Sequence, residues 1–528
     1  MISAPRYLLS LGLFLLALLS KTSVVILPAV LLGCAWWRRG RVAWRDLLRV
    51  LPFAALAAAL GCVTIWYQYH NAIGAEVVRT DGPAARVAGA GWAVWFYLYK
   101  AWLPVRLCAI YPRWTTSGSL LAFIPGLLFL GILLLFVRFR RSWGRPLLFA
   151  LGYFLVALLP VLGFLNIYFM RYSLVADQWQ YTALIGVVSL AAGSLAWRMD
   201  RRDSPARRRL GAGVWRTVST AVACALVLAC GALTFRQTLI YQDEETLWRD
   251  TLAKNPKAWI AHGNLAFLLA AKAMAPGEDS PSRRDEAQRY CQEALRELDQ
   301  AIALNPGYAE AYSYRGNLFS AANRYADALR DYDRAITLKP DYAEAYINRG
   351  NILAAAGRYG PAMGDYNQAI TLDPASADAW FNRGKVYART GYAKEAMRDL
   401  DRAIALKPAY AEALINRGNL LATAQRYTEA IRDYDQAIEI KPDDSVAYNN
   451  RGAIHAAGNR CAEAINDYTR AIEINSRYTG AYLNRAAAYF AIKDYPRALS
   501  DVSAAERLGG RPNPDFLRAL DKAAGRPN

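Results

Sequence analysis

A period of 34 residues dominates the second half of the chain. Proline returns at one point of successive periods, at Pro306, Pro340, Pro374, Pro408 and Pro442. Glycine returns at another point, at Gly316, Gly350, Gly384, Gly418 and Gly452. A period of this length indicates stacked copies of one supersecondary unit, because a unit this small cannot bury its apolar face alone.

Each period has the pattern of two helices joined by a turn. Alanine recurs at a position in the expected second helix, at Ala328, Ala362, Ala396, Ala430, Ala464 and Ala498. Small residues let paired helices approach closely, and proline marks the turn to the next unit. The pattern resembles the tetratricopeptide repeat (TPR). This resemblance predicts an all-α solenoid of about seven repeats over residues 257–510, with an insertion near 274–286 and a capping helix and tail over 511–528.

Asparagine recurs at one repeat position in the expected first helix, at Asn348, Asn382, Asn416, Asn450 and Asn484. First helices of such repeats line the concave surface. We interpret the five side chains as peptide-binding residues, because a ladder of amides is able to hydrogen-bond the backbone of an extended peptide without reading its sequence. The alternative is that these amides satisfy backbone hydrogen bonds between repeats.

Arginine and aspartate also recur in equal number. The arginines are Arg315, Arg349, Arg383, Arg417, Arg451 and Arg485, and the aspartates are Asp331, Asp365, Asp399, Asp433, Asp467 and Asp501. Opposite charges at fixed repeat positions favour a structural role. We therefore expect salt bridges between helices rather than a binding site.

The first 242 residues have a different composition. They hold 25 Lys and Arg residues against 6 Asp and Glu, which accounts for the whole formal net charge of +19. The basic residues lie beside long apolar runs, a setting typical of cytoplasmic loops rather than of nucleic-acid binding. The runs cover residues 7–37, 48–68, 92–110, 119–137, 146–168, 174–197 and 217–235. Most are close to the roughly 20 residues that a membrane-spanning helix needs.

The arginine-rich loops set the expected orientation. Residues 38–49, 138–145 and 198–216 are dense in arginine and are assigned to the cytoplasm. The loops then alternate correctly between the two sides of the membrane if the run 92–110 does not cross the membrane. Lys100, Pro104 and Arg106 lie in the middle of that run, which favours a re-entrant segment over a spanning helix with snorkelling ends.

The first run, 7–37, is either one kinked span or a short helical hairpin. With about six spans, residues 1–236 form a polytopic membrane helix bundle. A linker helix follows over 237–256, and the solenoid lies on the non-cytoplasmic side. The expected location is the bacterial inner membrane, with the repeats in the periplasm.

Cysteine and histidine give no sign of a metal site or a cofactor. The seven cysteines contain no C-x-x-C pair, and His70, His262 and His455 are far apart in sequence. The pattern of cysteines and histidines therefore predicts neither a disulfide framework nor a metal centre, and no cofactor is expected.

The join between the two halves carries a more specific motif. Trp248, Leu252, Asn255-Pro256 and Trp259 follow the last apolar run. Upstream stand Leu19-Ser20-Lys21 with Leu27-Pro28, and Ala176-Asp177 with Tyr181. Together these residues resemble bacterial relatives of the transmembrane and tetratricopeptide repeat containing protein O-mannosyltransferases. The resemblance implies a GT-C-like membrane domain, a polyprenyl- or dolichyl-phosphate sugar donor, and repeats that recruit the acceptor protein.

The chain departs from that family at its catalytic loop. The family's carboxylates lie in the first non-cytoplasmic loop, and we expect this chain to begin past that loop. No catalytic residue is therefore assigned. Arg171 and Asp177 are candidates for binding the donor phosphate, with an interfacial ion pair as the alternative.

Our leading hypothesis is a membrane-anchored TPR protein that binds proteins or peptides outside the cytoplasm. The alternative is an active protein O-mannosyltransferase, so whether the chain is an enzyme stays open.

Overall fold

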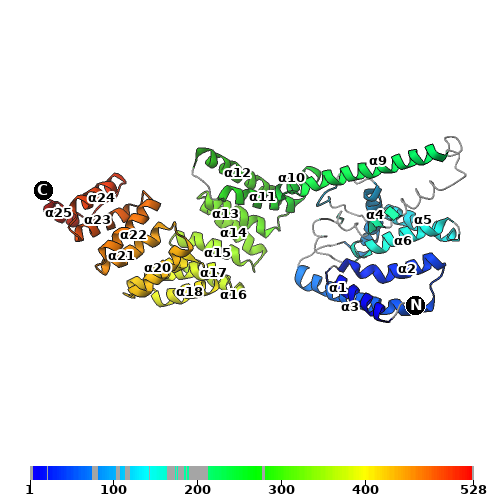
Figure 1. The fold of residues 1–528 in the computed structure, drawn as a ribbon, viewed down its shortest axis with the longest axis horizontal. Helices are drawn as coiled ribbons and strands as arrows, with labels where there is room; N and C mark the ends of the chain where they lie inside the picture. Colours follow the sequence, from blue (N-terminus) through cyan, green and yellow to red (C-terminus); the bar gives the residue numbers. More distant parts are fainter. Residues whose placement is uncertain are drawn as a thin grey trace. The chain divides into compact units, whose positions relative to one another are not determined.

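The computed structural model describes residues 4–525, except 21, 74–80, 103–106, 113–118, 142, 163, 165–169, 171–172, 174, 177–182, 186, 190–211 and 276–279 (Figure 1). These residues form helices and turns, with no strand among them. The chain divides into two compact units, Met1–Pro306 and Gly307–Asn528. The all-α prediction is confirmed for the described residues.

The second unit is the repeat solenoid. It holds six pairs of antiparallel helices and a last single helix, one pair for each 34-residue period. The helices are α13 (Ala309–Ala321), α14 (Tyr325–Leu338), α15 (Ala343–Ala355), α16 (Tyr359–Leu372), α17 (Ala377–Arg389), α18 (Ala393–Leu406), α19 (Ala411–Thr423), α20 (Tyr427–Ile440), α21 (Ser445–Ala457), α22 (Cys461–Ile474), α23 (Thr479–Ala491), α24 (Tyr495–Arg507) and α25 (Pro514–Ala523).

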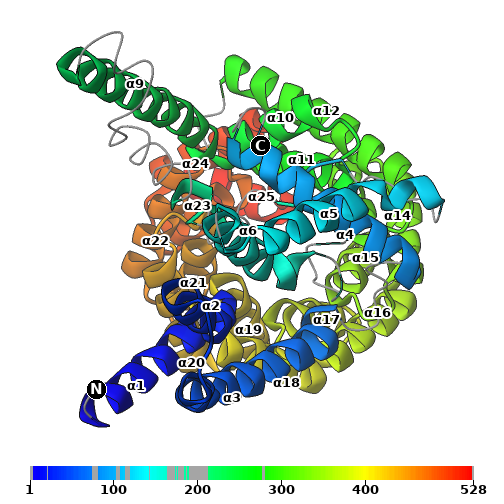
Figure 2. The same cartoon turned by 90° about the vertical axis from the view of Figure 1, so that its right-hand side faces the viewer.

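The solenoid is curved, with the first helix of each pair on the inner side. The first helices of successive repeats, such as α15 and α17, approach one another more closely than the second helices do. Figure 2 shows α16, α18, α20 and α22 outside the curve and α15, α17, α19 and α21 inside it. The inner face is therefore built from the first helices, as the repeat pattern predicts.

Glycine permits the close approach of the two helices within a repeat. A methyl group added at Gly418 would lie 2.7 Å from the ring of Tyr434 on the partner helix. The last repeat has Ala486 at this position, and the residue that corresponds to Tyr434 is the smaller Val502. The two positions therefore share one fixed volume.

The first unit contains the apolar runs and the first repeat-like helices. Its helices are α1 (Ala4–Ser20), α2 (Leu27–Arg39), α3 (Trp44–Tyr67), α4 (Pro83–Trp102), α5 (Ile124–Arg138), α6 (Gly144–Leu158), α9 (Ala212–Thr238), α10 (Glu244–Lys254), α11 (Trp259–Met274) and α12 (Pro281–Leu304). Its largest apolar core lies among α4, α5 and α6, around Tyr97, Phe154 and Leu158.

The run 7–37 is a helical hairpin rather than one kinked span. The Tyr7 hydroxyl donates to the Arg49 carbonyl at 2.7 Å, and the rings of Phe14 and Phe53 lie 5.4 Å apart, so α1 and α3 run in the same direction. Helix α2 runs opposite to α3, because the short loop 40–43 joins them and Arg39 contacts Asp46. Helices α1 and α2 are therefore antiparallel.

Two expected boundaries differ from the observed ones. The run 92–110 is not one helix, because α4 begins at Pro83 and ends at Trp102. The insertion expected near 274–286 is shorter, because α11 continues to Met274 and α12 starts at Pro281. Ser280 caps α12 by accepting a hydrogen bond from the Arg283 amide, which explains the early start.

Two described helices are long and apolar enough to cross a membrane, Trp44–His70 and Leu120–Arg138. The expected bundle of about six spans is therefore not shown. Helix α9 covers the expected run 217–235.

Candidate peptide-binding surface

The recurring arginines and aspartates pair within each repeat. Arg417 donates from Nε and Nη2 to the two carboxylate oxygens of Asp433, at 2.8 and 2.7 Å. The same two-bond pair joins Arg315 to Asp331, Arg349 to Asp365, Arg383 to Asp399, Arg451 to Asp467 and Arg485 to Asp501. The expectation of salt bridges between helices is met by these contacts.

In five of these pairs the remaining nitrogen of the arginine reaches the preceding repeat, from Arg349, Arg383, Arg417, Arg451 and Arg485. Nη1 of Arg417 lies 2.8 Å from Asp401, and Nη1 of Arg451 lies 2.7 Å from Asp435. The Asp433 side chain is only 8% exposed, whereas that of Asp401 is 54% exposed. Arg349, Arg417 and Arg451 thus hold their own two helices together through a buried aspartate and bind the neighbouring repeat through an exposed one.

Three of the five recurring asparagines hydrogen-bond between repeats. Asn348 Nδ2 donates to Asn317 Oδ1 at 3.0 Å, and Asn450 Nδ2 donates to Asn419 Oδ1 at 2.9 Å. Asn484 Nδ2 donates to Asn449 Oδ1 at 3.0 Å. These bonds join side chains, whereas the alternative considered from the sequence was bonding to the backbone of the neighbouring repeat.

The other two asparagines have a different environment. Asn416 Nδ2 donates to the Glu412 carbonyl of its own helix at 2.7 Å. The side chain of Asn382 makes no hydrogen bond to the described residues, although it is half-buried on the inner face. For Asn416 the difference has a local cause, because Lys385 stands at the acceptor position 31 residues before it; Asn382 has Asn351 at that position but does not bond to it.

The acceptor asparagines were missed in the sequence analysis. Asn317, Asn351 and Asn419 each accept a hydrogen bond from a tyrosine of the second helix, at 2.7 to 2.9 Å. Burial raises the pKa values of these tyrosines, Tyr332, Tyr366 and Tyr434, well above their usual range. The hydroxyls therefore stay protonated and act as donors. The signal was present as the recurring sequence Arg-Gly-Asn, at residues 315–317, 349–351 and 417–419.

Carboxylates accompany the central asparagines. Glu344, Asp378 and Glu412 are exposed and stand four residues before an asparagine, one helical turn away on the same face. Asp378 accepts a hydrogen bond from the Tyr410 hydroxyl at 2.8 Å. The inner face at the centre of the solenoid therefore offers amides beside negative charge.

The join motif holds a segment of the apolar region. Asn255 Nδ2 donates to the Ile110 carbonyl at 3.1 Å, and Lys254 Nζ donates to the Leu107 carbonyl at 2.7 Å. Ile110 packs against Trp248 and Leu252. The motif thus attaches the start of the repeat region to residues 107–111, which follow α4 in the chain.

The donor-phosphate candidates Arg171 and Asp177 lie outside the described residues. In the part of the chain that the structure describes, no group of three or more His, Cys, Asp or Glu side chains is placed to hold a metal ion. His262 is instead bound to Glu297 at 2.6 Å and to the Pro256 carbonyl at 3.0 Å, so it joins α11 to α12.

Comparison with known families identifies the repeats. Models described as TPR repeat match residues 316–357 and 350–391, and models described as tetratricopeptide repeat match residues 377–410 and 411–444. No curated protein matches the chain. The comparisons give no support to the resemblance to O-mannosyltransferases.

Solved structures of repeat proteins are similar over part of the chain. YrrB, described as a TPR protein with an unusual peptide-binding site, is 27% identical over 35% of this chain and 95% of its own, with a TM-score of 0.30. A tetratricopeptide repeat protein from Parabacteroides merdae is 20% identical over 49% of this chain and 99% of its own, with a TM-score of 0.36. PilF of Pseudomonas aeruginosa is 16% identical over 43% and 96%, with a TM-score of 0.36. The family models alone show tetratricopeptide repeats over residues 316–444.

Proposed function

We propose that this protein is a membrane-anchored TPR protein whose inner solenoid face binds an extended peptide segment outside the cytoplasm. The observation that carries the proposal is the contrast among the recurring asparagines. Asn348, Asn450 and Asn484 donate to neighbouring repeats, whereas Asn382 and Asn416 do not. Asn416 bonds only its own helix, and the half-buried Asn382 side chain makes no hydrogen bond to the described residues, which favours a partner from outside.

The carboxylates indicate the chemistry of the peptide. Glu344, Asp378 and Glu412 lie one turn from Asn348, Asn382 and Asn416 on the inner face. A segment whose backbone bonds the amides would place its side chains near these negative charges. We therefore expect a preference for peptides that contain Lys or Arg.

The experiment measures binding of an unstructured Lys-Gly-Ser peptide to the full chain in detergent, by fluorescence anisotropy. The double variant Asn382→Ala/Asn416→Ala should weaken binding by about thirtyfold, since each lost hydrogen bond contributes about 1 kcal/mol and about 1.4 kcal/mol is a factor of ten. The melting temperature of the solenoid should not change. Asn348→Ala is the control, because it removes a bond between repeats and should lower the melting temperature. Unchanged binding in the double variant would reject the amide surface.

Membrane insertion is supported by the exposure of the apolar helices. In the candidate spans Trp44–His70 and Leu120–Arg138, only 11% and 6% of the apolar window is buried. The core helix of a soluble protein would be mostly buried. Large exposed apolar surfaces need a cover, and a lipid bilayer supplies one for helices of this length.

The expected orientation is supported by two contacts. Arg145, at the start of α6, donates to the Trp36 carbonyl near the end of α2 at 3.0 Å, which brings two arginine-rich loops to one end of this helix pair. Residues 107–111 contact Asn255, and the expected orientation assigns both of these segments to the non-cytoplasmic side. The alternative, an active glycosyltransferase, has no contact among the described residues in its favour.

A further inference from the structure

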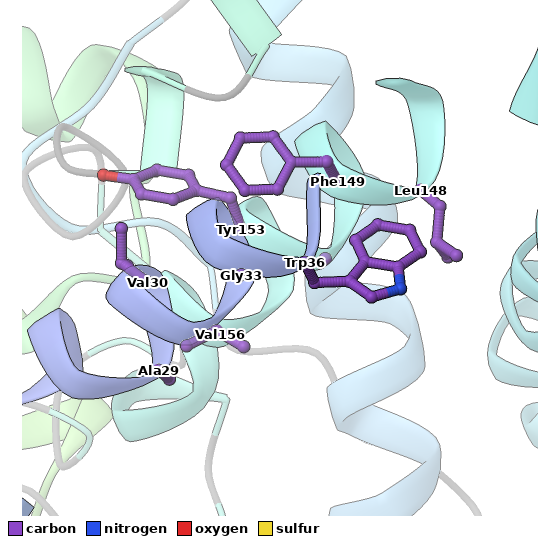
Figure 3. Close-up of a pocket in the computed structure, with 9 residues that line it drawn as sticks. Ala29, Val30, Gly33, Trp36, Leu148, Phe149, Tyr153 and Val156 are labelled. Atoms are coloured by element: carbon purple, nitrogen blue, oxygen red, sulfur yellow. The ribbon is translucent and has the colours of Figure 1, made fainter. Parts of the chain in front are cut away.

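An apolar groove lies between helices α2 and α6 (Figure 3). Its volume is about 320 Å³, and it follows about two turns of each helix. The lining residues are Ala29, Val30, Gly33, Trp36, Leu148, Phe149, Gly152, Tyr153 and Val156. The lining side chains are apolar except for the hydroxyl of Tyr153 and the indole N–H of Trp36. Such a groove suits a hydrocarbon chain.

Glycines keep the groove open. A methyl group added at Gly152 would meet no atom within 4 Å, so the space beside this residue is empty of protein. Gly33 faces Phe149, whose ring would lie 3.3 Å from such a methyl group. The two helices contact each other at Trp37 and Phe149, whose rings stack 5.0 Å apart.

One end of the groove is strongly basic. The Arg145 guanidinium lies over the Trp36 ring, 5.7 Å from its centre, and donates to the Trp36 carbonyl. The loops that flank this end carry Arg38, Arg39, Arg41, Arg45, Arg138, Arg140 and Arg141. Asp46 is the only acidic residue in these two loops, and it pairs with Arg39 at 2.5 Å. The remaining positive charge is available to an anion.

We propose that the groove binds one acyl chain of an anionic phospholipid, whose phosphate lies against the arginines at the end of α2 and the start of α6. An apolar slot that ends in a cluster of guanidinium groups matches such a lipid in both parts, and basic pockets between membrane helices recognise anionic headgroups. A zwitterionic lipid offers the same chain without the net charge. This inference rests on the membrane insertion proposed above.

The experiment reconstitutes the full chain in phosphatidylcholine vesicles that contain a trace of phosphatidylglycerol with a photoactivatable acyl chain. The parallel sample contains phosphatidylcholine with the same photoactivatable chain. Cross-linked peptides are mapped by mass spectrometry. The α2–α6 peptides should be labelled several times more strongly by the phosphatidylglycerol probe, whereas the outward face of α5 should be labelled equally by both.

Two variants separate the two parts of the site. Gly152→Leu extends a side chain into the groove from a position where a Cβ meets no atom within 4 Å, and it should remove most of the α2–α6 labelling. Gly12→Leu is its matched control, because Gly12 also has no atom within 4 Å and lies on α1, away from the groove. Arg38→Gln/Arg141→Gln removes two exposed charges and should reduce the preference for phosphatidylglycerol by about fivefold or more.

Each outcome bears on a different claim. Equal labelling of α2–α6 by both probes, with α5 labelled, would overturn the lipid site and leave membrane insertion intact. Undiminished labelling in Gly152→Leu would likewise overturn it. Absence of labelling on α5 as well as on α2–α6 would overturn membrane insertion, and the lipid site with it.

Discussion

The two halves of the chain differ in which side chains they bury and which they expose. In the repeat half, buried charges and amides find partners on the neighbouring helix, as in Arg417 with Asp433. In the apolar half, residues such as Leu130 point outward with 51% of their surface exposed. A solenoid closes its contacts between neighbouring repeats, so its energetics are local. Helices that expose leucine side chains need an apolar surrounding that the described residues do not provide.

The largest effect should come from the arginine pairs. Asp433→Ala leaves the buried end of Arg417 without its partner and should destabilise the solenoid by about 3–5 kcal/mol. Asp401→Ala removes the exposed partner of the same arginine and should cost at most about 1 kcal/mol. Chemical denaturation followed by circular dichroism measures both. Equal losses would show that the pairing within a repeat is no stronger than the pairing between repeats.

A new charge at two equally exposed apolar positions tests the contrast directly. Leu130→Arg, near the middle of α5, should oppose membrane insertion by about 2.5–3.5 kcal/mol. Ile492→Arg, at a residue 50% exposed in the last repeat, should change stability by less than about 0.5 kcal/mol. Carbonate extraction of membranes reads out the first variant and thermal unfolding the second. If Leu130→Arg stays fully inserted, the exposed face of α5 is not a lipid-facing surface.

A smaller effect should come from the glycines. Gly418→Ala places a methyl group against Tyr434 and should destabilise the solenoid by about 1–3 kcal/mol. Gly364, within α16, has no atom within 4 Å of an added methyl group, so Gly364→Ala should stabilise by up to about 1 kcal/mol. Melting temperatures of the two variants should therefore move in opposite directions. A shift in the same direction would refute the packing argument.

The smallest effect should be the pH response of two histidines. Burial lowers the pKa of His262, but the Glu297 carboxylate and the Pro256 carbonyl outweigh it, so that the pKa is raised. Its contribution to stability is complete below pH about 6.5 and is lost as pH rises through the raised value. Burial, helped by Arg460, lowers the pKa of His455. Its neutral form stabilises above pH about 6.5, and this contribution is lost as pH falls through the lowered value.

Hydrogen exchange of α11 and α21, measured across this pH range, follows the two histidines separately. His262→Gln should flatten the response of α11. His455→Leu should flatten that of α21, because Leu353 and Leu421 occupy the same repeat position. If the protection of both helices changed in the same direction with pH, the opposite pKa shifts of His262 and His455 would be contradicted.

The two halves also differ in how much the sequence alone predicts. Arg417 and Asp433 were paired correctly because their spacing is repeated six times, which separates a structural contact from chance. The acceptor Asn419 was missed because its position is asparagine in only three repeats, with lysine or alanine in the others. A recurring residue indicates a contact that every repeat makes. A contact made in only some repeats leaves no such pattern in the sequence.

In the apolar half, hydropathy located the runs but not the helix ends. Helix α4 begins at Pro83 and continues through Ala88, Gly89 and Ala90, which a search for strongly apolar runs passes over. The next small residue, Gly91, approaches the Gly126 backbone, and Trp95 Nε1 donates to the Pro125 carbonyl at 2.8 Å. Partners distant in sequence decide such contacts, so no local pattern reveals them.

Cysteine accessibility in intact cells tests the central claim, an anchored solenoid outside the cytoplasm, most directly. In a variant without the natural cysteines, single cysteines replace Ala375, in an exposed turn of the solenoid, or Arg41, in the first arginine-rich loop. A membrane-impermeant maleimide should label Ala375→Cys in intact cells and Arg41→Cys only after the cells are opened. Labelling of Arg41→Cys with protection of Ala375→Cys would place the repeats in the cytoplasm and contradict the account.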